Sequence, residues 1–297
     1  MSLARRVAAM AAATSSSGTT RVAVAQMTST NDHAHNLNTT RTLARSARDR
    51  GASLLFLPEC VAFLGNSRDE TRAAAERFDA VVDTYASLAK ELGLWLCLGG
   101  VQERSHVPSK VHNTQLLISD RGSIEARYRK IHLFDVDVPN GPVLRESEYT
   151  EPGADLVVAS VPNGPNIGLS TCYDLRFPDL YQRLRFDYGA DVLTVPSAFT
   201  KPTGEAHWEV LLRARAIETQ CYVIAAAQAG RHSERRESYG HALIVDPWGA
   251  VVGRCDDPDG TDIAVADLDL ELVQRIRQKM PIGQHRRDLS EAAKRGA

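Results

Sequence analysis

An apolar run changes into a polar, helix-starting sequence at the cysteine of Asn166-Ile-Gly-Leu-Ser-Thr-Cys172-Tyr-Asp-Leu-Arg176-Phe-Pro178. This pattern predicts a buried strand that carries the sulfur to a sharp turn, followed by a helix. The first N–H groups of a helix have no partner within the helix, and its N-terminus is partly positive. Both features favour a thiolate and a neighbouring oxyanion. A buried, inert cysteine is the alternative, because free cysteines are among the most buried residues.

The overall composition is that of an ordinary soluble globular protein. Of the 297 residues, 43% are hydrophobic and 24% are charged, and the formal net charge of −2 creates no field that favours nucleic acid or a membrane surface. No apolar run approaches the length of a membrane span. The five cysteines are scattered and form no Cys-x-x-Cys pair, which indicates free thiols in a reducing compartment.

The N-terminal part of the chain has a composition of its own. Residues 1–31 contain three arginines and many small residues but no Asp or Glu. This is typical of an organellar transit peptide, and a disordered leader without a targeting role is the alternative. We expect residues 1–20 to lie outside the fold, a single domain over 21–287 and an exposed tail over 288–297. The expected location is cytoplasmic, or mitochondrial if the leader is a transit peptide.

Two β-α-β-like halves, each interrupted by hairpins, account for the rest of the chain. In the first half, the expected elements are strands over 21–27, 53–59 and 94–100 and helices over 32–50 and 69–92. Hairpins are expected around Asp120-Arg-Gly122 and Pro247-Trp-Gly249. In the second half, the expected elements are strands over 157–161, 166–171, 190–197, 222–228 and 262–267 and helices over 176–187, 205–219 and 268–280.

This order of elements predicts the fold class. Alternating strands and helices imply sheets with covered faces. The sequence shows no repeat, low-complexity linker or internal change of composition. The simplest arrangement is one α/β domain with two layered sheets and helices on the outer faces, which is a four-layer αββα sandwich.

Several polar residues stand where predicted strands end. Glu59 closes one apolar strand, Lys130 closes another, and Glu146 lies in a long loop over 131–153. A loop of that length within a compact domain is usually functional, and ligands in layered α/β folds gather at the carboxyl ends of strands. Where such groups meet a cysteine, the carboxylate can take the thiol proton and the ammonium can stabilise an oxyanion. Taken singly, Glu59 and Glu146 are more typical of a solvated surface, and Lys130 is at least as consistent with one.

The combination resembles the nitrilase superfamily of carbon–nitrogen hydrolases. The matching motifs are Phe56-Leu-Pro-Glu59, Tyr128-Arg-Lys130-Ile-His132-Leu-Phe134 and Gly168-Leu-Ser-Thr-Cys172-Tyr-Asp-Leu-Arg176-Phe-Pro178. They occur in the order and at the separations of the superfamily's Glu, Lys and Cys motifs, and the resemblance runs from about Arg21 to His285. Three motifs in order argue against the inert cysteine and imply the nitrilase type of αββα sandwich.

Within the superfamily, the chain is most similar to the branch that contains deaminated glutathione amidase and ω-amidase. Residues 217–232 and 284–287 resemble the former more than the latter. The branch implies hydrolysis of the terminal amide of deaminated glutathione, or of a similar α-keto acid amide, to the acid and ammonia through a cysteine thioester. The alternatives are an ω-amidase acting on α-ketoglutaramate or α-ketosuccinamate, and a catalytically idle interaction scaffold.

The resemblance also assigns roles to residues. It implies that Glu59 is the general base, that Lys130 stabilises the oxyanion and that Cys172 is the nucleophile. The second glutamate of the family precedes a Pro-Gly in the long loop, and Glu146 fits that spacing better than the neighbouring acids Glu148 and Glu151. It implies no metal and no organic cofactor, and the histidines show no metal-ligand spacing.

Substrate-binding residues are expected around the cysteine. The backbone N–H of Tyr173 would complete the oxyanion site. Arg176 lies one helical turn beyond Cys172, and its guanidinium suits a substrate carboxylate, with a helix surface or an internal salt bridge as the alternative. Phe199 follows a buried strand and is expected either in the pocket wall or in the apolar core. The partners implied are a small-molecule amide and, because the superfamily pairs subunits through helices, further copies in a homodimer or larger homo-oligomer.

Overall fold

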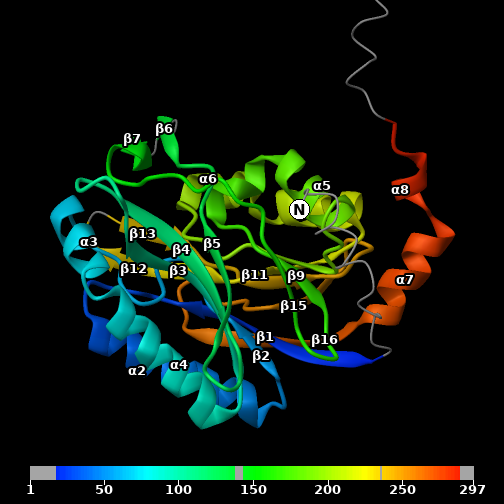
Figure 1. The fold of residues 1–297 in the computed structure, drawn as a ribbon, viewed down its shortest axis with the longest axis horizontal. Coiled ribbons are helices and arrows are strands. Elements are labelled where there is room, and N and C mark those ends of the chain that lie inside the picture. Colours follow the sequence, from blue (N-terminus) through cyan, green and yellow to red (C-terminus); the bar gives the residue numbers. More distant parts are fainter. Residues whose placement is uncertain (1–17, 138–142, 235, 288–297) are drawn as a thin grey trace, which may run out of the picture.

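Two β-sheets lie face to face between two layers of helices (Figure 1). This is the four-layer αββα sandwich predicted from the sequence. The computed structural model describes residues 18–137, 143–234 and 236–287. The predicted tail over 288–297 and nearly all of the predicted leader lie outside the described residues.

The larger sheet has eight strands. Its order is β13 (Arg236–Tyr239), β12 (Ala227–Ser233), β1 (Thr19–Met27), β2 (Leu54–Phe56), β3 (Trp95–Arg104), β4 (Val111–Ile118) and β5 (Ile124–Arg129), with β16 (Asp262–Asp269) paired antiparallel to β1. Strands β1, β2 and β3 are parallel to one another. Their carboxyl ends therefore meet at one edge of the sheet, the position at which layered α/β folds bind ligands.

The second sheet has six strands and a parallel centre. Its order is β15 (Val251–Arg254), β14 (Leu243–Val245), β11 (Tyr222–Ala225), β10 (Val192–Thr194), β9 (Asn166–Gly168) and β8 (Val158–Ser160). Strands β9, β10 and β11 are parallel. A separate two-stranded sheet, β6 (Asp135–Asp137) and β7 (Val143–Arg145), lies within the predicted long loop.

The helices cover the outer faces of the two sheets (Figure 1). On the larger sheet lie α2 (His33–Asp49) and α4 (Phe78–Leu92), and on the smaller sheet lie α5 (Pro178–Phe186) and α6 (Lys201–Thr219). The remaining helices are α3 (Arg68–Ala75), α7 (Leu270–Lys279), α8 (Ile282–His285) and the 3₁₀ helices η1 (Glu146–Glu148) and η2 (Cys172–Arg176). Asp32 caps the start of α2, because its side chain accepts the N–H groups of Ala34 and His35.

Strand β1 contains an uninterrupted apolar run over residues 22–25, and its surroundings explain this run. Alternate side chains of a strand point to opposite faces of the sheet. Val22 and Val24 belong to the core cluster that includes residues of the second sheet, whereas Ala23, Ala25 and Met27 pack in the cluster with α2 and α4. Both faces of the strand are therefore buried, as in a sheet covered on both sides.

Two predicted elements were wrong. The predicted helix over 69–92 is two helices, α3 and α4, because the backbone leaves the helix at Glu76 and Arg77. The predicted strand over 222–228 is also two elements, β11 in the smaller sheet and β12 in the larger one. Ala226 lies at this crossing and is buried, so an apolar run continues where the chain changes sheets. Hydrophobic periodicity cannot mark either break, since the burial pattern persists through it.

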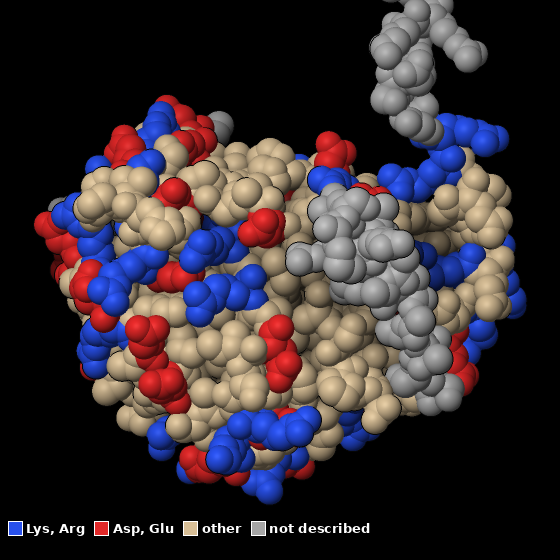
Figure 2. Space-filling view, viewed as in Figure 1, with Lys and Arg blue, Asp and Glu red and all other residues tan. Residues whose placement is uncertain are grey.

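The surface carries charges of both signs. Figure 2 shows Asp and Glu side chains interspersed with Lys and Arg side chains over one face of the molecule. In the part of the chain that the structure describes, no helix combines the length and the apolar character that crossing a membrane requires.

Candidate active site

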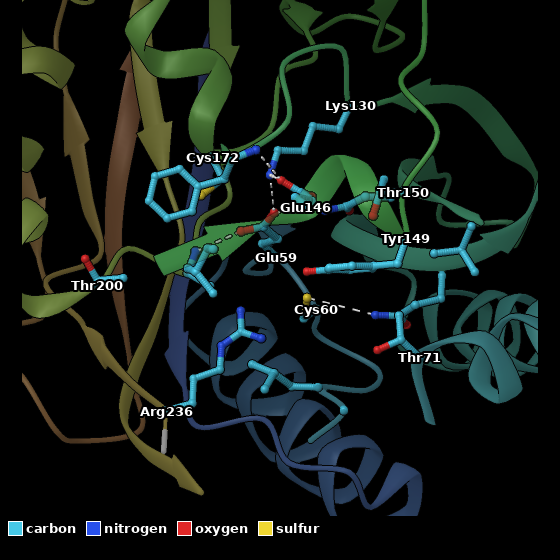
Figure 3. Close-up of a pocket in the computed structure, with 18 of the residues that line it drawn as sticks. Glu59, Cys60, Thr71, Lys130, Glu146, Tyr149, Thr150, Cys172, Thr200 and Arg236 are labelled. Atoms are coloured by element: carbon cyan, nitrogen blue, oxygen red, sulfur yellow. Dashed lines mark hydrogen bonds and ion pairs between the residues drawn. The ribbon is translucent and has the colours of Figure 1, made fainter. Parts of the chain in front are cut away.

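The ammonium of Lys130 lies between the carboxylates of Glu59 and Glu146 (Figure 3). Its Nζ donates to Oε1 of Glu59 at 3.0 Å, and to Oε2 and Oε1 of Glu146 at 2.8 and 3.1 Å. All three side chains are buried. Buried charges persist only when they are paired and hydrogen-bonded, so the two carboxylates hold the ammonium in a defined position.

The other acids of the loop lie elsewhere. Glu148 pairs with Arg68, and Glu151 accepts a hydrogen bond from Ser105. The structure therefore brings Glu146, and neither of its two neighbours, to the lysine.

Glu59 is held by contacts from three segments. Strand β2 ends just before it, and the backbone turns sharply after it at Cys60, which has a φ of 60°. Besides Lys130, Oε1 of Glu59 accepts Nδ2 of Asn113 at 2.8 Å, and Oε2 accepts the backbone N–H of Ala198 at 3.0 Å. Hydrogen bonds to both oxygens orient the carboxylate as a base that cannot rotate away.

Two glycines in β3 make this packing possible. A Cβ on Gly100 would lie 2.4 Å from Oδ1 of Asn113, and a Cβ on Gly99 would lie 2.3 Å from Cβ of Pro196. The register of β3 against β4 shifts at this point, as at a β-bulge. The pair therefore lets segments of the two sheets approach closely beside Glu59. The sequence signal for this role is weak, since two glycines also mark an ordinary strand end.

The sharp turn predicted at Cys172 is present. The residue has a φ of 51°, in the left-handed region that non-glycine residues rarely adopt, and its N–H donates to the carbonyl of Pro196 at 2.9 Å. Such backbone strain clusters at active sites. The element that follows is the five-residue 3₁₀ helix η2, and α5 begins later, at Pro178. The predicted helix therefore does not start beside the sulfur.

The charge state of the site follows from burial and pairing. Burial, and next the charge of Glu59, raise the pKa of the Cys172 thiol well above its ordinary value of 9.0. Burial opposes ionisation of Glu59, but the charge of Lys130 and the hydrogen bond from its ammonium help to outweigh it and lower the pKa of this carboxyl. Burial likewise opposes the charge of Lys130, yet the carboxylates of Glu146 and Glu59 raise the pKa of the ammonium well above its usual value.

The resting site is therefore a thiol beside a carboxylate and an ammonium. The expectation of a thiolate was wrong, because the short 3₁₀ helix supplies little helix dipole and burial opposes the charge. Glu59 and Cys172 line the same cavity, and the charge of Glu59 acts on the thiol, so this carboxylate is the base placed to take the thiol proton during attack.

Glu59, Lys130, Glu146 and Cys172 all line one cavity of about 480 Å³. This volume is within the range of small-molecule sites. The same wall includes Tyr149, Thr200 and Arg236 (Figure 3), which sequence reasoning did not single out. In the sequence, the only indication of a role for these residues was that they lie near the matching motifs. Tertiary packing, which the sequence does not show, brings β13 and the long loop to the cavity.

The predicted substrate-binding side chains lie outside the wall of this cavity. The guanidinium of Arg176 lies over the rings of Tyr173 and Phe199, with 5.8 and 5.6 Å to their centroids, and Nη1 is 3.2 Å from Nδ1 of His207. Phe199 is buried against Trp208, with 4.8 Å between ring centroids. Of the two alternatives for Phe199, the structure therefore favours the apolar core, and the carboxylate-binding role of Arg176 stays a prediction.

The backbone of Tyr173 remains suited to its predicted task. Its N–H follows directly on the residue that carries the sulfur, and it makes no hydrogen bond to the described part of the chain. An N–H group in this position can donate to an oxygen that becomes negative as the sulfur attacks.

The described part of the chain contains no cluster of side chains suited to bind a metal ion. Across residues 18–137, 143–234 and 236–287, no three side chains of His, Cys, Asp or Glu lie together so that they could hold a metal ion.

Comparisons with known proteins identify the family. The family described as carbon–nitrogen hydrolase matches residues 21–278. The deaminated glutathione amidase of Bos taurus is 48% identical over 287 residues, which cover 95% of this chain and 86% of that protein. The crystal structure of the C. elegans NitFhit protein is similar with a TM-score of 0.85 and 42% identity, over 92% of this chain and 66% of that longer one. Saccharomyces cerevisiae Nit3, a member of branch 10 of the nitrilase superfamily, is similar with a TM-score of 0.79 and 30% identity, over 92% of this chain and 98% of that one.

Proposed function

Because the chain belongs to the carbon–nitrogen hydrolase family, we propose that this amide hydrolase acts on deaminated glutathione, or on a similar α-keto acid amide, through a thioester of Cys172. One observation supports this function above all. A thiol, a base and an ammonium, which stand far apart in the sequence, share one cavity. The name of the bovine relative supports the choice of substrate.

The first half of the reaction uses the resting charges of the site. Sγ of Cys172 attacks the amide carbon while its proton passes to the carboxylate of Glu59. The carbonyl oxygen becomes negative and is held by Nζ of Lys130 and the N–H of Tyr173. Glu59 then gives the proton to the departing nitrogen, the C–N bond breaks, and an acyl thioester remains on the sulfur. Glu146 keeps Lys130 charged and oriented throughout.

The second half of the reaction reverses these roles. Glu59 takes a proton from a water molecule as its oxygen attacks the thioester carbon. The oxyanion uses the same two donors, the C–S bond breaks, and the proton returns to the sulfur. The acid leaves, and the neutral thiol is restored.

The leaving group depends on the amide. Glutathione is a tripeptide without a primary amide, so the bond next to its deaminated glutamyl part releases the amine of a dipeptide. Ammonia leaves only from primary amides such as α-ketoglutaramate. The sequence-based expectation of ammonia therefore applies to the second class of substrate alone, whereas the acyl product, an α-keto acid, is common to both.

Product analysis tests this function. Purified protein is incubated with deaminated glutathione and with α-ketoglutaramate, and α-ketoglutarate release is measured against the Cys172→Ala variant. We expect turnover of both, with a higher kcat/KM for deaminated glutathione. A higher kcat/KM for α-ketoglutaramate would indicate an ω-amidase. Absence of turnover with every amide tried, together with unreactive Cys172, would indicate an interaction scaffold.

We also propose that the protein pairs with a second copy through α6. Val210 and Ile217 on this helix are 69% and 46% exposed, and Trp248 of the β14–β15 turn is 64% exposed. Ile217 reaches this turn, since a Cβ on Gly249 would lie 2.6 Å from its Cδ1. Large apolar side chains gathered on a surface favour association. Sedimentation of the wild type and of Val210→Glu tests this: a homodimer that the variant dissociates supports the pairing, and a monomeric wild type contradicts it.

A further inference from the structure

Arg236 is a cation at the cavity wall that the proposed mechanism does not use. It begins β13, and its guanidinium points into the cavity toward Cys60 and Glu59 (Figure 3). Although the residue is exposed to solvent, its charge reaches the cavity interior, where it acts to lower the pKa of the carboxyl of Glu59 and of the thiol of Cys60. An arginine at this position faces whatever enters the cavity.

The charges around Arg236 leave it available to a ligand. The other cation of the outer wall, Lys201, is paired with Glu237 at 2.6 Å. Among the described residues, Arg236 has no carboxylate within ion-pair distance. An unpaired guanidinium beside a cavity is a ready partner for a carboxylate, which it can bind with two parallel hydrogen bonds.

The interior of the cavity makes such a cation necessary for an acidic substrate. Glu59 and Glu146 carry two negative charges against the single positive charge of Lys130. The thiol of Cys172 is neutral, so the reaction centre has a net negative charge. A substrate carboxylate would be repelled there unless a positive group held it at a distance. Arg176, the sequence-based candidate for this task, lies outside the cavity wall.

We propose that Arg236 is a specificity-determining residue that binds a carboxylate of the amide substrate. This inference rests on the proposed function, and it assigns to that function the residue that distinguishes acidic from neutral amides. The carboxylate has two sources, the α-keto acid part that becomes the thioester and the glycine end of the leaving dipeptide. The first is present in both α-ketoglutaramate and deaminated glutathione, and the second in deaminated glutathione alone.

Kinetics of the Arg236→Gln variant with three different amides distinguish the two substrate carboxylates. We measure kcat/KM for deaminated glutathione, α-ketoglutaramate and the uncharged pentanamide. Loss of a charge-assisted hydrogen bond predicts a decrease of roughly ten- to a hundredfold for acidic amides, mainly in KM, and little change for pentanamide. A decrease with both acidic amides identifies the α-keto acid carboxylate as the ligand, and a decrease with deaminated glutathione alone identifies the glycine carboxylate. Arg236→Lys should restore part of the loss.

The matched control is Arg231→Gln. Arg231 is an exposed arginine in β12 of the same hairpin, and it does not line the cavity. The same loss of charge there should leave all three kcat/KM values within about twofold of the wild type, because charges exposed to solvent are screened. Equal effects of Arg236→Gln on all three amides, or equal effects of the two variants, would overturn the inference.

A binding measurement keeps this test separate from that of the proposed function. Calorimetry with glutarate, a dicarboxylate of similar length, is carried out on the wild type, Arg236→Gln and Arg231→Gln. If the wild type fails to hydrolyse the α-keto acid amides, the proposed substrate is wrong, but weaker glutarate binding in Arg236→Gln alone still supports the carboxylate site. Equal glutarate affinity in all three proteins, or no binding to any of them, contradicts it.

Discussion

The hydroxyl of Tyr128 donates to the buried carboxylate of Asp174 at 2.6 Å. Tyr128 stands two residues before Lys130, and Asp174 stands two residues after Cys172. The same carboxylate accepts the backbone N–H of His132 at 3.0 Å and lies 2.7 Å from its Nδ1. One carboxylate therefore joins the strand that ends in the lysine to the turn that carries the sulfur.

Tyr128→Phe removes this donor and preserves the ring. We expect the free energy of unfolding to fall by about 1–3 kcal/mol, because a buried carboxylate loses a partner. We also expect a lower kcat at nearly constant KM, because the ammonium and the sulfur lose their fixed separation. Denaturant unfolding and steady-state kinetics measure both quantities. Tyr188→Phe, at an exposed tyrosine, is the control; identical behaviour of the two variants would show that the bond to Asp174 does not position the site.

Cys172→Ala should abolish turnover and leave the fold intact, since the alanine fits the space of the cysteine but cannot form the thioester. Product release and circular dichroism measure the two properties. Cys255→Ala is the matched control, because Cys255 is also buried but does not line the cavity; it should retain kcat. Residual wild-type activity in Cys172→Ala would exclude covalent catalysis at this sulfur.

Lys130→Met should reduce kcat by at least ~10²-fold, as when an oxyanion donor is lost. It also leaves the carboxylates of Glu59 and Glu146 buried without a counter-charge, so we expect a loss of about 3–5 kcal/mol in the free energy of unfolding near neutral pH. Lys90→Met, at an exposed position of α4, controls for removal of a lysine. A near-normal kcat in Lys130→Met would remove the ammonium from the mechanism.

The thiol of Cys172 should remain protonated at neutral pH. Its pKa in the folded protein is raised above the ordinary value of 9.0 by burial and by Glu59. Its contribution to stability is therefore fully present below pH 9.0 and is lost as the pH rises through the raised pKa. The difference in ultraviolet thiolate absorbance between wild type and Cys172→Ala should be absent at pH 7 and appear only above pH 9.0. A thiolate signal at pH 7 would contradict the neutral resting state.

Arg176→Ala should affect acidic and neutral amides alike, because its guanidinium packs on the rings of Tyr173 and Phe199. Loss of these contacts predicts a decrease of about 0.5–2 kcal/mol in the free energy of unfolding. The ratio of KM for α-ketoglutaramate to KM for pentanamide should stay constant. A selective rise in KM for the acidic amide would return Arg176 to the substrate site.

The amino-acid sequence by itself determined the layers and indicated the candidate reacting groups. Strands buried on both faces favour near-continuous apolar runs, so β1 could be recognised from the local run over residues 22–25. Helix starts such as Asp32 depend on local hydrogen bonds, which are properties of a few neighbouring residues. Glu59, Lys130 and Cys172 could be identified because their motifs are local and occur in a characteristic order.

Only the tertiary structure decided how these groups behave. The neutral state of the Cys172 thiol depends on burial and on the distant charge of Glu59. Arg236 lines the cavity and Arg176 does not, because the direction of a long side chain is set by packing between segments that are remote in sequence. Distances across a fold, local dielectric and the pairing of charges are not properties of any short stretch of chain. For this reason, patterns of residues could indicate the chemistry, whereas the charge state and the substrate-facing wall required the assembled cavity.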